Sequence, residues 1–359
     1  MTMRQIRSHN RLRGTLLVTS LLLGGQGCAS CGQRAVCSQV GINDPENLTM
    51  RRQLLAFGTG ETCKEMLARN APLKLSEDAP IIGRFFPRNC VFRELPGGNL
   101  VIQFEGDGYG WTNVSRKLTF TSGATVEYSP DFRCSNESAI YAYFPARKIE
   151  RSQFQLRTLE VGNVAGGLLG GFVTPVAESF ARQMVSGKLS EGFTVIRNDD
   201  GNIEFGIGII PAGQHPTKPF KLASNGKLTY ENARVEVHQG QRDFIGPIVI
   251  RDSGQAIALT LMLDGAPGLD VMLLGTDEAQ PALAAYIAST AAPPMPPARV
   301  LNDVLVQGRP YKRSVPVRPG TYYVVLDHTA TAGGTSPPNN VFDERGAVVS
   351  YAVQIGDAS

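Results

Sequence analysis

The segment Asn99-Leu-Val-Ile-Gln-Phe-Glu105 decides the fold class of this 359-residue chain. It is rich in β-branched and aromatic residues, and a glycine-rich stretch follows it. Three more runs of the same kind come soon after, at 117–121, 124–128 and 139–144. Such residues favour strands, and short strands at this spacing, separated by turn residues, indicate an antiparallel sheet. The sequence therefore predicts a mainly β fold for this region.

Strands are also predicted beyond residue 220. Their expected positions are 233–238, 247–250, 256–263, 270–274, 311–317, 318–327 and 347–355. Residues 278–289 have the one helical pattern among them. We therefore expect two β-rich domains, an antiparallel sheet domain at 44–210 and a C-terminal β-sandwich-like domain at 220–359. A proline-containing linker at 211–219 would join them.

Helices are expected only as small additions to the first domain. Short helices are predicted at 48–55 and around 63–67, and a hairpin at 192–210. The clearest helical pattern lies near 174–186 and places an apolar stripe on one side, within 173–185. This helix could cover one face of a sheet, or it could lie on lipid.

The N-terminus is organised like an export signal. Four arginines within the first 13 residues precede an apolar run at 14–23, and small residues then lead to Cys28. The apolar run is ten residues long, about half of the ~20 residues that a transmembrane helix needs. The sequence therefore predicts a removable signal peptide at 1–27, followed by a tether at 28–43.

This arrangement resembles a bacterial lipoprotein signal, in which the cysteine after the cleavage site is acylated. Gly27 directly before Cys28 fits that pattern, whereas Gly25 stands where the family usually has leucine. Cys31 is a rival acceptor. The resemblance implies acylation, for example with palmitate, and stable anchoring by several acyl chains. Because neither cysteine is followed by aspartate, it also implies the outer membrane rather than the inner one.

All six cysteines lie in the first 134 residues. An exported protein meets an oxidising compartment, where disulfides are the default. The possible disulfide cysteines are Cys37, Cys63, Cys90 and Cys134. A bridge between Cys90 and Cys134 would join the two ends of the first sheet region. Acylation of Cys28 leaves an odd number of cysteines and acylation of Cys31 an even number, so signal geometry and parity favour different acceptors. No histidine lies near these cysteines in the sequence, and no metal site is predicted.

The charge of the mature chain argues against nucleic acid as a partner. Removing residues 1–27 takes away four arginines and no acidic residue, which lowers the formal net charge from +3 to −1. A near-neutral chain offers no bulk electrostatic attraction for nucleic acid or for anionic membrane surfaces. Contact with the membrane is therefore expected through the lipid anchor alone, with an envelope protein or a glycan as the possible partner.

The sequence contains no recognisable catalytic or cofactor motif, and no cofactor is predicted. A nucleophile elbow, a phosphate-binding loop and paired metal-ligand histidines are all absent. The histidines beyond the signal are His215, His238 and His328. An exported hydrolase would need His238 or His328 beside a carboxylate or a serine, for which Ser314 and Ser350 are considered.

Two aromatic residues, Tyr109 and Trp111, are the candidate ligand contacts. Aromatic rings on a sheet can stack on sugars, although aromatic residues in small sheets also form cores. The alternative functions are thus a lipid- or glycan-binding lipoprotein, which would use these aromatics or the stripe at 173–185, and an exported hydrolase.

Two further resemblances concern larger parts of the chain. The segments at 83–87, 108–112 and 240–247 are similar to parts of uncharacterised lipoproteins of myxobacteria. The run Pro-Gly-Thr-Tyr-Tyr-Val-Val at 319–325 resembles the pre-peptidase C-terminal type of β-sandwich, over roughly 300–357. That resemblance implies a non-catalytic appendage. The function predicted from the sequence is therefore a non-enzymatic, membrane-anchored lipoprotein that binds or organises partners in the cell envelope.

Overall fold

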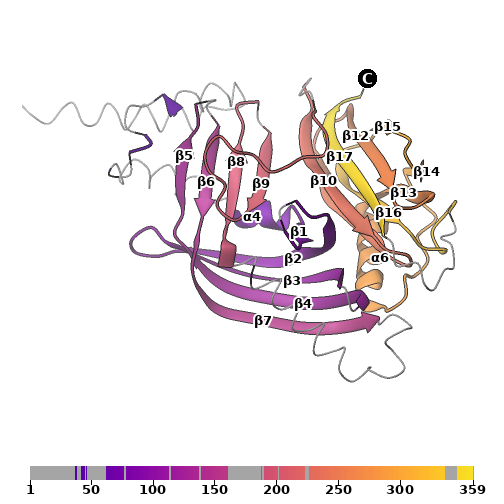
Figure 1. Cartoon of the computed structure of the whole chain (residues 1–359), viewed down its shortest axis with the longest axis horizontal. Helices are drawn as coiled ribbons and strands as arrows, with labels where there is room; N and C mark the ends of the chain where they lie inside the picture. The colour runs from indigo at the N-terminus through magenta and orange to yellow at the C-terminus, as the bar shows by residue number, and fades with distance from the viewer. Residues whose placement is uncertain are drawn as a thin grey trace, which may run out of the picture.

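The computed structural model describes residues 37–38, 42–44, 46, 62–76, 78–112, 115–136, 139–160, 187, 190–200, 202–222, 226–335 and 346–358. Strands dominate the described residues, with 17 strands and two helices, so the mainly β fold is confirmed. Figure 1 shows a curved sheet in the N-terminal half and a stack of sheets in the C-terminal half.

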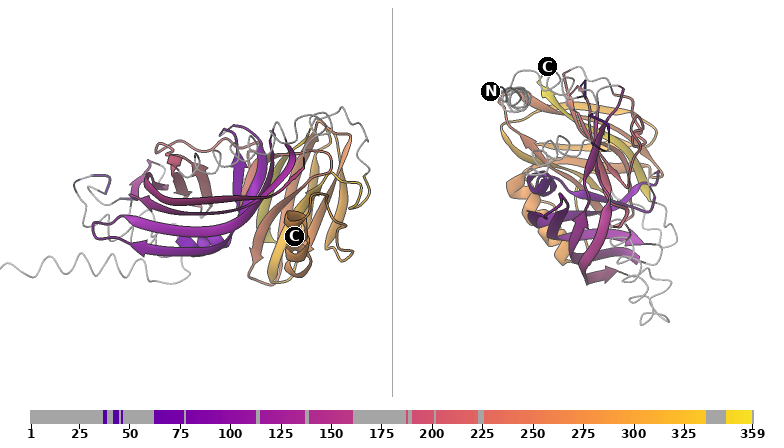
Figure 2. Two further views of the ribbon diagram at one scale, coloured as in Figure 1. Left: turned by 90° about the horizontal axis from the view of Figure 1, so that it is seen from below. Right: turned by 90° about the vertical axis from the view of Figure 1, so that its left-hand side faces the viewer.

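The N-terminal half is built on four long antiparallel strands that curve together (Figures 1 and 2). They are β2 (Ile81–Glu94), β3 (Leu100–Thr112), β4 (Ser115–Tyr128) and β7 (Ala146–Glu160), and the short β1 (Ala71–Lys74) pairs with β2. Register shifts interrupt each of these pairings. Such bulges bend a strand and increase its twist, which accounts for the curvature.

A smaller sheet runs across the concave side of the curved sheet (Figure 2). Its strands, in order, are β5 (Asp131–Cys134), β6 (Ile140–Phe144), β8 (Phe193–Arg197) and β9 (Ile203–Ile207). Phe144 from this sheet packs in one core with Phe85 and Phe104 of the curved sheet, and Met66 from α4 (Thr62–Leu67) joins them. The predicted hairpin at 192–210 and the predicted helix around 63–67 are both confirmed.

The C-terminal half consists of two sheets packed face to face around a single core. One sheet contains β15 (Tyr311–Pro316), β12 (Gln255–Asp264), β17 (Ala347–Asp357) and β10 (Leu228–Val237). The other contains β11 (Arg242–Ile250), β16 (Gly320–Asp327), β13 (Gly268–Gly275) and β14 (Leu301–Val306). The outer face of this second sheet packs against α6 (Thr276–Ala288), the helix expected at 278–289.

The two halves share both a sheet and a core. β10 pairs in parallel with β2 at Val235 and Ile81, so the sheet of β10 continues into the curved sheet. Tyr109 of β3 packs edge-on against Tyr286 of α6. The buried ammonium of Lys117 on β4 donates hydrogen bonds of 2.7 Å to the carbonyl oxygen of Tyr286 and of 2.7 Å to that of Ser289. It thereby satisfies carbonyls that the C-terminal end of α6 leaves without helical partners.

Several strands were not expected from the sequence. β2 contains Pro87, which normally excludes a central strand, but the register shifts immediately after it, at the pairing of Asn89. Proline is tolerated at such bulges because the ladder is already interrupted there. β7 is rich in charged residues and lies at the edge of its sheet, where charged side chains are common. β1 and β5 were missed because each has only four residues, and β14 was missed because Asn302 and Asp303 interrupt its apolar pattern.

Two disulfides join Cys37 to Cys134 and Cys63 to Cys90. The proposed bridge between Cys90 and Cys134 is therefore wrong. Cys90 lies on β2 of the curved sheet, whereas Cys134 lies on β5 of the smaller sheet. The α4 helix brings Cys63 onto β2, and the segment around Cys37 brings its sulfur to the end of β5.

Several expectations fall outside the described residues: the signal at 1–27, most of the tether at 28–43, the helix at 48–55 and the helix near 174–186. In the described part of the chain, no helix has both the length and the apolar character needed to cross a bilayer.

Candidate functional site

The candidate site lies where three segments meet between the curved sheet and the C-terminal half. We call Trp111, Glu236, His238, Gln241 and His328 the junction site. Trp111 lies near the end of β3, and His328 follows β16. Glu236 lies at the end of β10, and His238 and Gln241 lie in the turn from β10 to β11. Backbone hydrogen bonds join two of these segments: His328 N donates to Gln241 O at 3.0 Å, and within the turn Gln241 N donates to His238 O at 3.0 Å.

Trp111 and His238 form the partly exposed rim of the junction site. Their ring centroids lie 4.1 Å apart with the planes tilted by 53°. His238 Nε2 lies 2.9 Å from Glu236 Oε1, which fixes the imidazole. The side chains of His238 and Glu236 are 18% and 22% exposed, so the rim reaches solvent. The indole Nε1 of Trp111 is buried and has no hydrogen-bond partner.

His328 is a deeply buried residue of the site, at 4% exposed. Its Nδ1 lies 3.1 Å from Val237 O. A carbonyl oxygen can only accept, so Nδ1 carries the hydrogen and donates. Burial lowers the pKa of His328 below its usual value, which keeps the ring neutral. Its buried Nε2 therefore presents a lone pair, and this atom has no partner.

Gln241 is 6% exposed and completes the site. Its Oε1 accepts from the backbone nitrogen of His238 at 3.3 Å, but its Nε2 has no partner. Across the described residues, only three buried side-chain nitrogen or oxygen atoms lack a partner, and they belong to Trp111, Gln241 and His328. Trp111 contacts the ring of His238, Gln241 accepts from the backbone nitrogen of His238, and His328 bonds to the carbonyl oxygen of the preceding residue, Val237. Burying an unpaired polar group costs about 1–3 kcal/mol, so these three residues stand out from ordinary packing.

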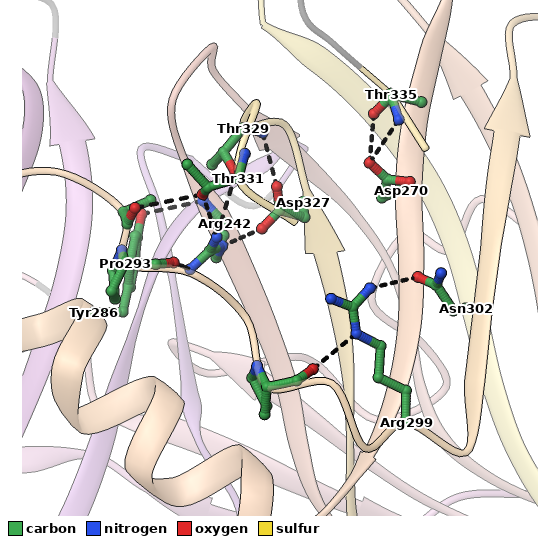
Figure 3. Close-up of polar contacts among 12 residues, drawn as sticks. Arg242, Asp270, Tyr286, Pro293, Arg299, Asn302, Asp327, Thr329, Thr331 and Thr335 are labelled. Atoms are coloured by element: carbon green, nitrogen blue, oxygen red, sulfur yellow. Dashed lines mark hydrogen bonds and ion pairs between the residues drawn. The ribbon is translucent and has the colours of Figure 1, made fainter. Parts of the chain in front are cut away.

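A buried ion pair holds the two segments of the site in register (Figure 3). Arg242 follows Gln241, Asp327 precedes His328, and the guanidinium of Arg242 donates to the carboxylate of Asp327. Both side chains are fully buried. Arg242 also donates to the carbonyl oxygen of Pro293 and, at 2.9 Å, to the hydroxyl of Thr331. Gln241 and His328 are thus positioned by a network that lies immediately beside them.

A second buried network ties the same region to the curved sheet. Arg84 of β2 is fully buried and donates from Nε to both oxygens of Asp243, at 2.8 and 2.9 Å. It also donates to Glu231 at 3.1 Å and to the hydroxyl of Tyr351 at 2.8 Å. The residues of this network come from β2, β10, β11 and β17. It is therefore a further connection between the two halves.

The candidate aromatics Tyr109 and Trp111 both lie on β3 but in different surroundings. Tyr109 is 3% exposed and belongs to the core around α6. Burial, together with the Asp243 carboxylate, raises the pKa of Tyr109 well above its usual range, so its hydroxyl stays protonated. That hydroxyl donates to Asp243 at 2.9 Å and accepts from Phe244 N at 2.7 Å. Of the two rings, only that of Trp111 reaches the rim of the junction site.

The histidines and serines considered for a hydrolase do not form a triad among the described residues. His238 has a carboxylate partner, Glu236, but neither His238 nor His328 has a hydrogen bond to a serine. Ser350 pairs with Arg234, four residues before His238 on β10, which corresponds to about 13 Å along a strand. It lines a separate cavity of about 360 Å³. His215 instead lies between Glu204 and Tyr141, each at 3.3 Å.

Ser314 is further away still, on the edge strand β15. In the part of the chain that the structure describes, no group of three His, Cys, Asp or Glu side chains could hold a metal ion.

The pKa of His328 leads to a testable pH dependence. In the unfolded chain this imidazole takes up a proton near pH 6.5, whereas burial opposes protonation in the folded protein. The unfolded state therefore binds more protons as the pH falls below about 6.5, and the folded state loses stability. We expect the urea midpoint of the wild type to fall more, between about pH 7 and pH 5, than that of His328→Gln. An equal fall in both proteins would contradict the buried, neutral state of His328.

The sequence pointed to Trp111, His238 and His328 separately, but not to their proximity, and it missed Glu236 and Gln241. Glu236 and His238 have the i, i+2 spacing that places side chains on one face of a strand. This spacing could have indicated from the sequence that the two side chains interact. Gln241 had no such signal, because glutamine in a turn is usually exposed and the pairing of its segment with His328 joins residues far apart in the chain. The segments at 83–87, 108–112 and 240–247 do come together, through Arg84, Tyr109 and Asp243.

Comparison with models of known protein families and with curated proteins finds no match to this chain. The function is therefore inferred from the junction site, the disulfides and the N-terminal sequence alone.

Proposed function

We propose that this protein is an exported lipoprotein, held at the outer membrane by an acylated N-terminal cysteine, that binds envelope partners without catalysing a reaction. The observation that carries this proposal is the pairing of Cys37 with Cys134 and of Cys63 with Cys90. Stable disulfides form in oxidising compartments and are rare in the cytosol. Two of them support the export that the N-terminal sequence predicts.

The pairing leaves the same two candidates for the acylated cysteine and makes them distinguishable. With four cysteines in disulfides, Cys28 and Cys31 remain as acceptors. If Cys28 is acylated, Cys31 stays in the mature chain as one additional thiol. If Cys31 is acylated, Cys28 leaves with the signal and no thiol remains. The number of reactive thiols therefore distinguishes the two acceptors.

We expect Cys28→Ser to move the protein from the membrane fraction to the soluble fraction, because the acyl chains are its only anchor in this proposal. Cys31→Ser is the matched control and should stay with the membrane. The measurements are fractionation, intact mass of the mature chain and thiol counting under non-reducing conditions. The opposite pattern would assign the anchor to Cys31. Membrane association of both single variants and of the double variant, with no acyl mass on the wild type, would overturn the lipoprotein proposal.

A binding rather than a catalytic role is supported by the junction site. It has a histidine with a carboxylate partner, but no described serine bonds to either histidine and no described residues form a metal-binding group. What it does present is a set of buried polar atoms without partners beside a partly exposed tryptophan. Such an arrangement suits a site that holds a ligand by hydrogen bonds.

A further inference from the structure

A cavity lies against β10 and β17, and its lining comes from both halves of the molecule. Its volume is about 360 Å³, and it is partly open to solvent. The lining residues are Lys74, Asp78, Ala79, Thr217, Pro219, Ala233, Arg234 and Ser350. A cavity of this volume, at the boundary between two folding units, has the size and position of a small-molecule site.

Three segments of the chain build this cavity. Its floor is formed by β10 and β17, where Arg234 lies directly opposite Ser350. One wall is the loop between β1 and β2, which Arg234 holds by donating a hydrogen bond to the carbonyl oxygen of Asp78. The other wall is the linker between the halves, and Asn232 bonds to both backbone groups of Phe220 at its end, at 2.8 and 3.3 Å. Both walls are therefore held to β10 by hydrogen bonds.

The charges of the cavity favour an anionic ligand. Lys74 and Arg234 each bring one positive charge and Asp78 brings one negative charge, so the lining residues have a formal balance of +1. An arginine has five N–H donors. Within the described part of the chain, the guanidinium of Arg234 has one hydrogen bond, to the carbonyl oxygen of Asp78. The hydroxyls of Thr217 and Ser350 line the same space and can also donate.

These donors select the chemical class of the ligand. A carboxylate or phosphate group offers acceptors only, and a guanidinium pairs with two of its oxygens at once. An ammonium group would instead meet two cationic side chains. The small apolar lining residues Ala79, Pro219 and Ala233 leave room for a short carbon skeleton beside the anionic group.

We propose that this cavity binds a small oxyanion, the carboxylate or phosphate group of a small molecule, with Arg234 and Lys74 as the cationic contacts. The site goes beyond the proposed function, because it is separate from the junction site and names a class of ligand that the export signal does not imply. It does not depend on which cysteine is acylated, or on whether one is.

Calorimetric titration of the full mature protein in a non-ionic detergent tests the site. The probes are succinate for a carboxylate and inorganic phosphate for a phosphate group, with methylammonium chloride as the cationic control. The titrations are run at low ionic strength, because salt screens exposed charges. We expect saturable binding of at least one of the two oxyanions and none of methylammonium. Where both bind, each should displace the other.

The matched variants are Arg234→Gln and Arg313→Gln. Arg234→Gln removes the guanidinium from the cavity, and we expect oxyanion binding at least about tenfold weaker, which corresponds to about 1.4 kcal/mol. Arg313 is exposed on β15, at the far edge of the same sheet, so the same change there should leave binding unaltered. Because Arg234→Gln also removes the bond to the loop, Ser350→Leu provides a second test. It fills the floor of the cavity without changing a charge and should abolish binding, and the urea midpoints of all variants are measured.

The outcomes identify the source of the oxyanion or overturn the site. Binding of succinate alone assigns the site to a carboxylate, and binding of phosphate alone assigns it to a phosphate group. No heat of binding from either probe with the folded wild type overturns the proposal. Wild-type affinity in either Arg234→Gln or Ser350→Leu overturns it as well, because the oxyanion would then bind elsewhere. Neither negative result bears on export or acylation, which are tested by the cysteine variants.

Discussion

Replacing Arg84 by methionine is expected to destabilise the folded protein by about 3–5 kcal/mol. The guanidinium is fully buried and donates to Asp243, Glu231 and Tyr351. Methionine fills part of the volume but leaves the buried carboxylate of Asp243 without its ion-pair partner. An uncompensated buried charge is costly because nothing replaces its lost hydration. Urea unfolding at neutral pH, followed by circular dichroism, measures the loss.

Arg88 is the matched control for this prediction. It lies four residues further along β2 and pairs with Asp107 at 3.0 Å, but its side chain is 58% exposed. Exposed ion pairs contribute little, so Arg88→Met should cost less than about 1 kcal/mol. Similar losses for the two variants would show that Arg84 is not the buried link between the halves.

A double variant tests whether the loss of the ion pair between Arg84 and Asp243 accounts for the destabilisation. In Arg84→Met with Asp243→Leu, no unpaired Asp243 carboxylate remains, so the loss should be smaller than the sum of the two single losses. The hydroxyl of Tyr109, which donates to Asp243 at 2.9 Å, would still lose its acceptor. The rescue is therefore expected to be incomplete. Strict additivity of the two losses would contradict the contact.

Removing the disulfide between Cys37 and Cys134 is expected to cost about 4–5 kcal/mol, the second of the two largest effects. The cysteines are 97 residues apart, and a long closed loop restricts the unfolded chain most in the chain-entropy model. Removing the disulfide between Cys63 and Cys90, 27 residues apart, should cost roughly 3–4 kcal/mol. The double serine variants are compared by urea unfolding without reductant.

The two disulfide variants are compared by how much free energy of unfolding each one loses. A larger loss for the Cys63 and Cys90 variant would show that local contacts, rather than loop length, set the contribution of each bridge. Peptide mapping without reduction checks the pairing directly. A peptide that links Cys90 to Cys134 would contradict the connectivity described above.

Much of the strand content was predictable because short runs of β-branched and aromatic residues indicate strands by themselves. The run at 99–105 lies within β3, and the runs at 117–121 and 124–128 lie within β4. They are one strand rather than two because Ser122 and Gly123 stay in the ladder with β7. β2 was missed because Pro87 is a poor strand residue by itself, and only the bulge that follows it in the pairing with β3 makes it acceptable.

The same distinction applies to the junction site. Trp111 could be selected from the sequence as an aromatic residue of the predicted sheet region. Gln241 could not, since glutamine in a turn is usually solvated and nothing local indicates that it is buried. Its hydrogen bonds to His238 are local, but the bond from His328 N to its carbonyl oxygen joins residues 87 positions apart, and that long-range pairing could not be read from the sequence.

The sequence by itself determined that this chain is mainly β, where its hairpin and its α6 helix lie, and that its cysteines are concentrated near the N-terminus. These properties follow from composition and from side-chain periodicity over a few residues. Only the tertiary structure decided which cysteines pair, that β10 continues the curved sheet, and that Trp111 packs against His238. These features depend on register and on packing between segments far apart in the chain, where a shift of one residue moves a side chain to the opposite face of its sheet.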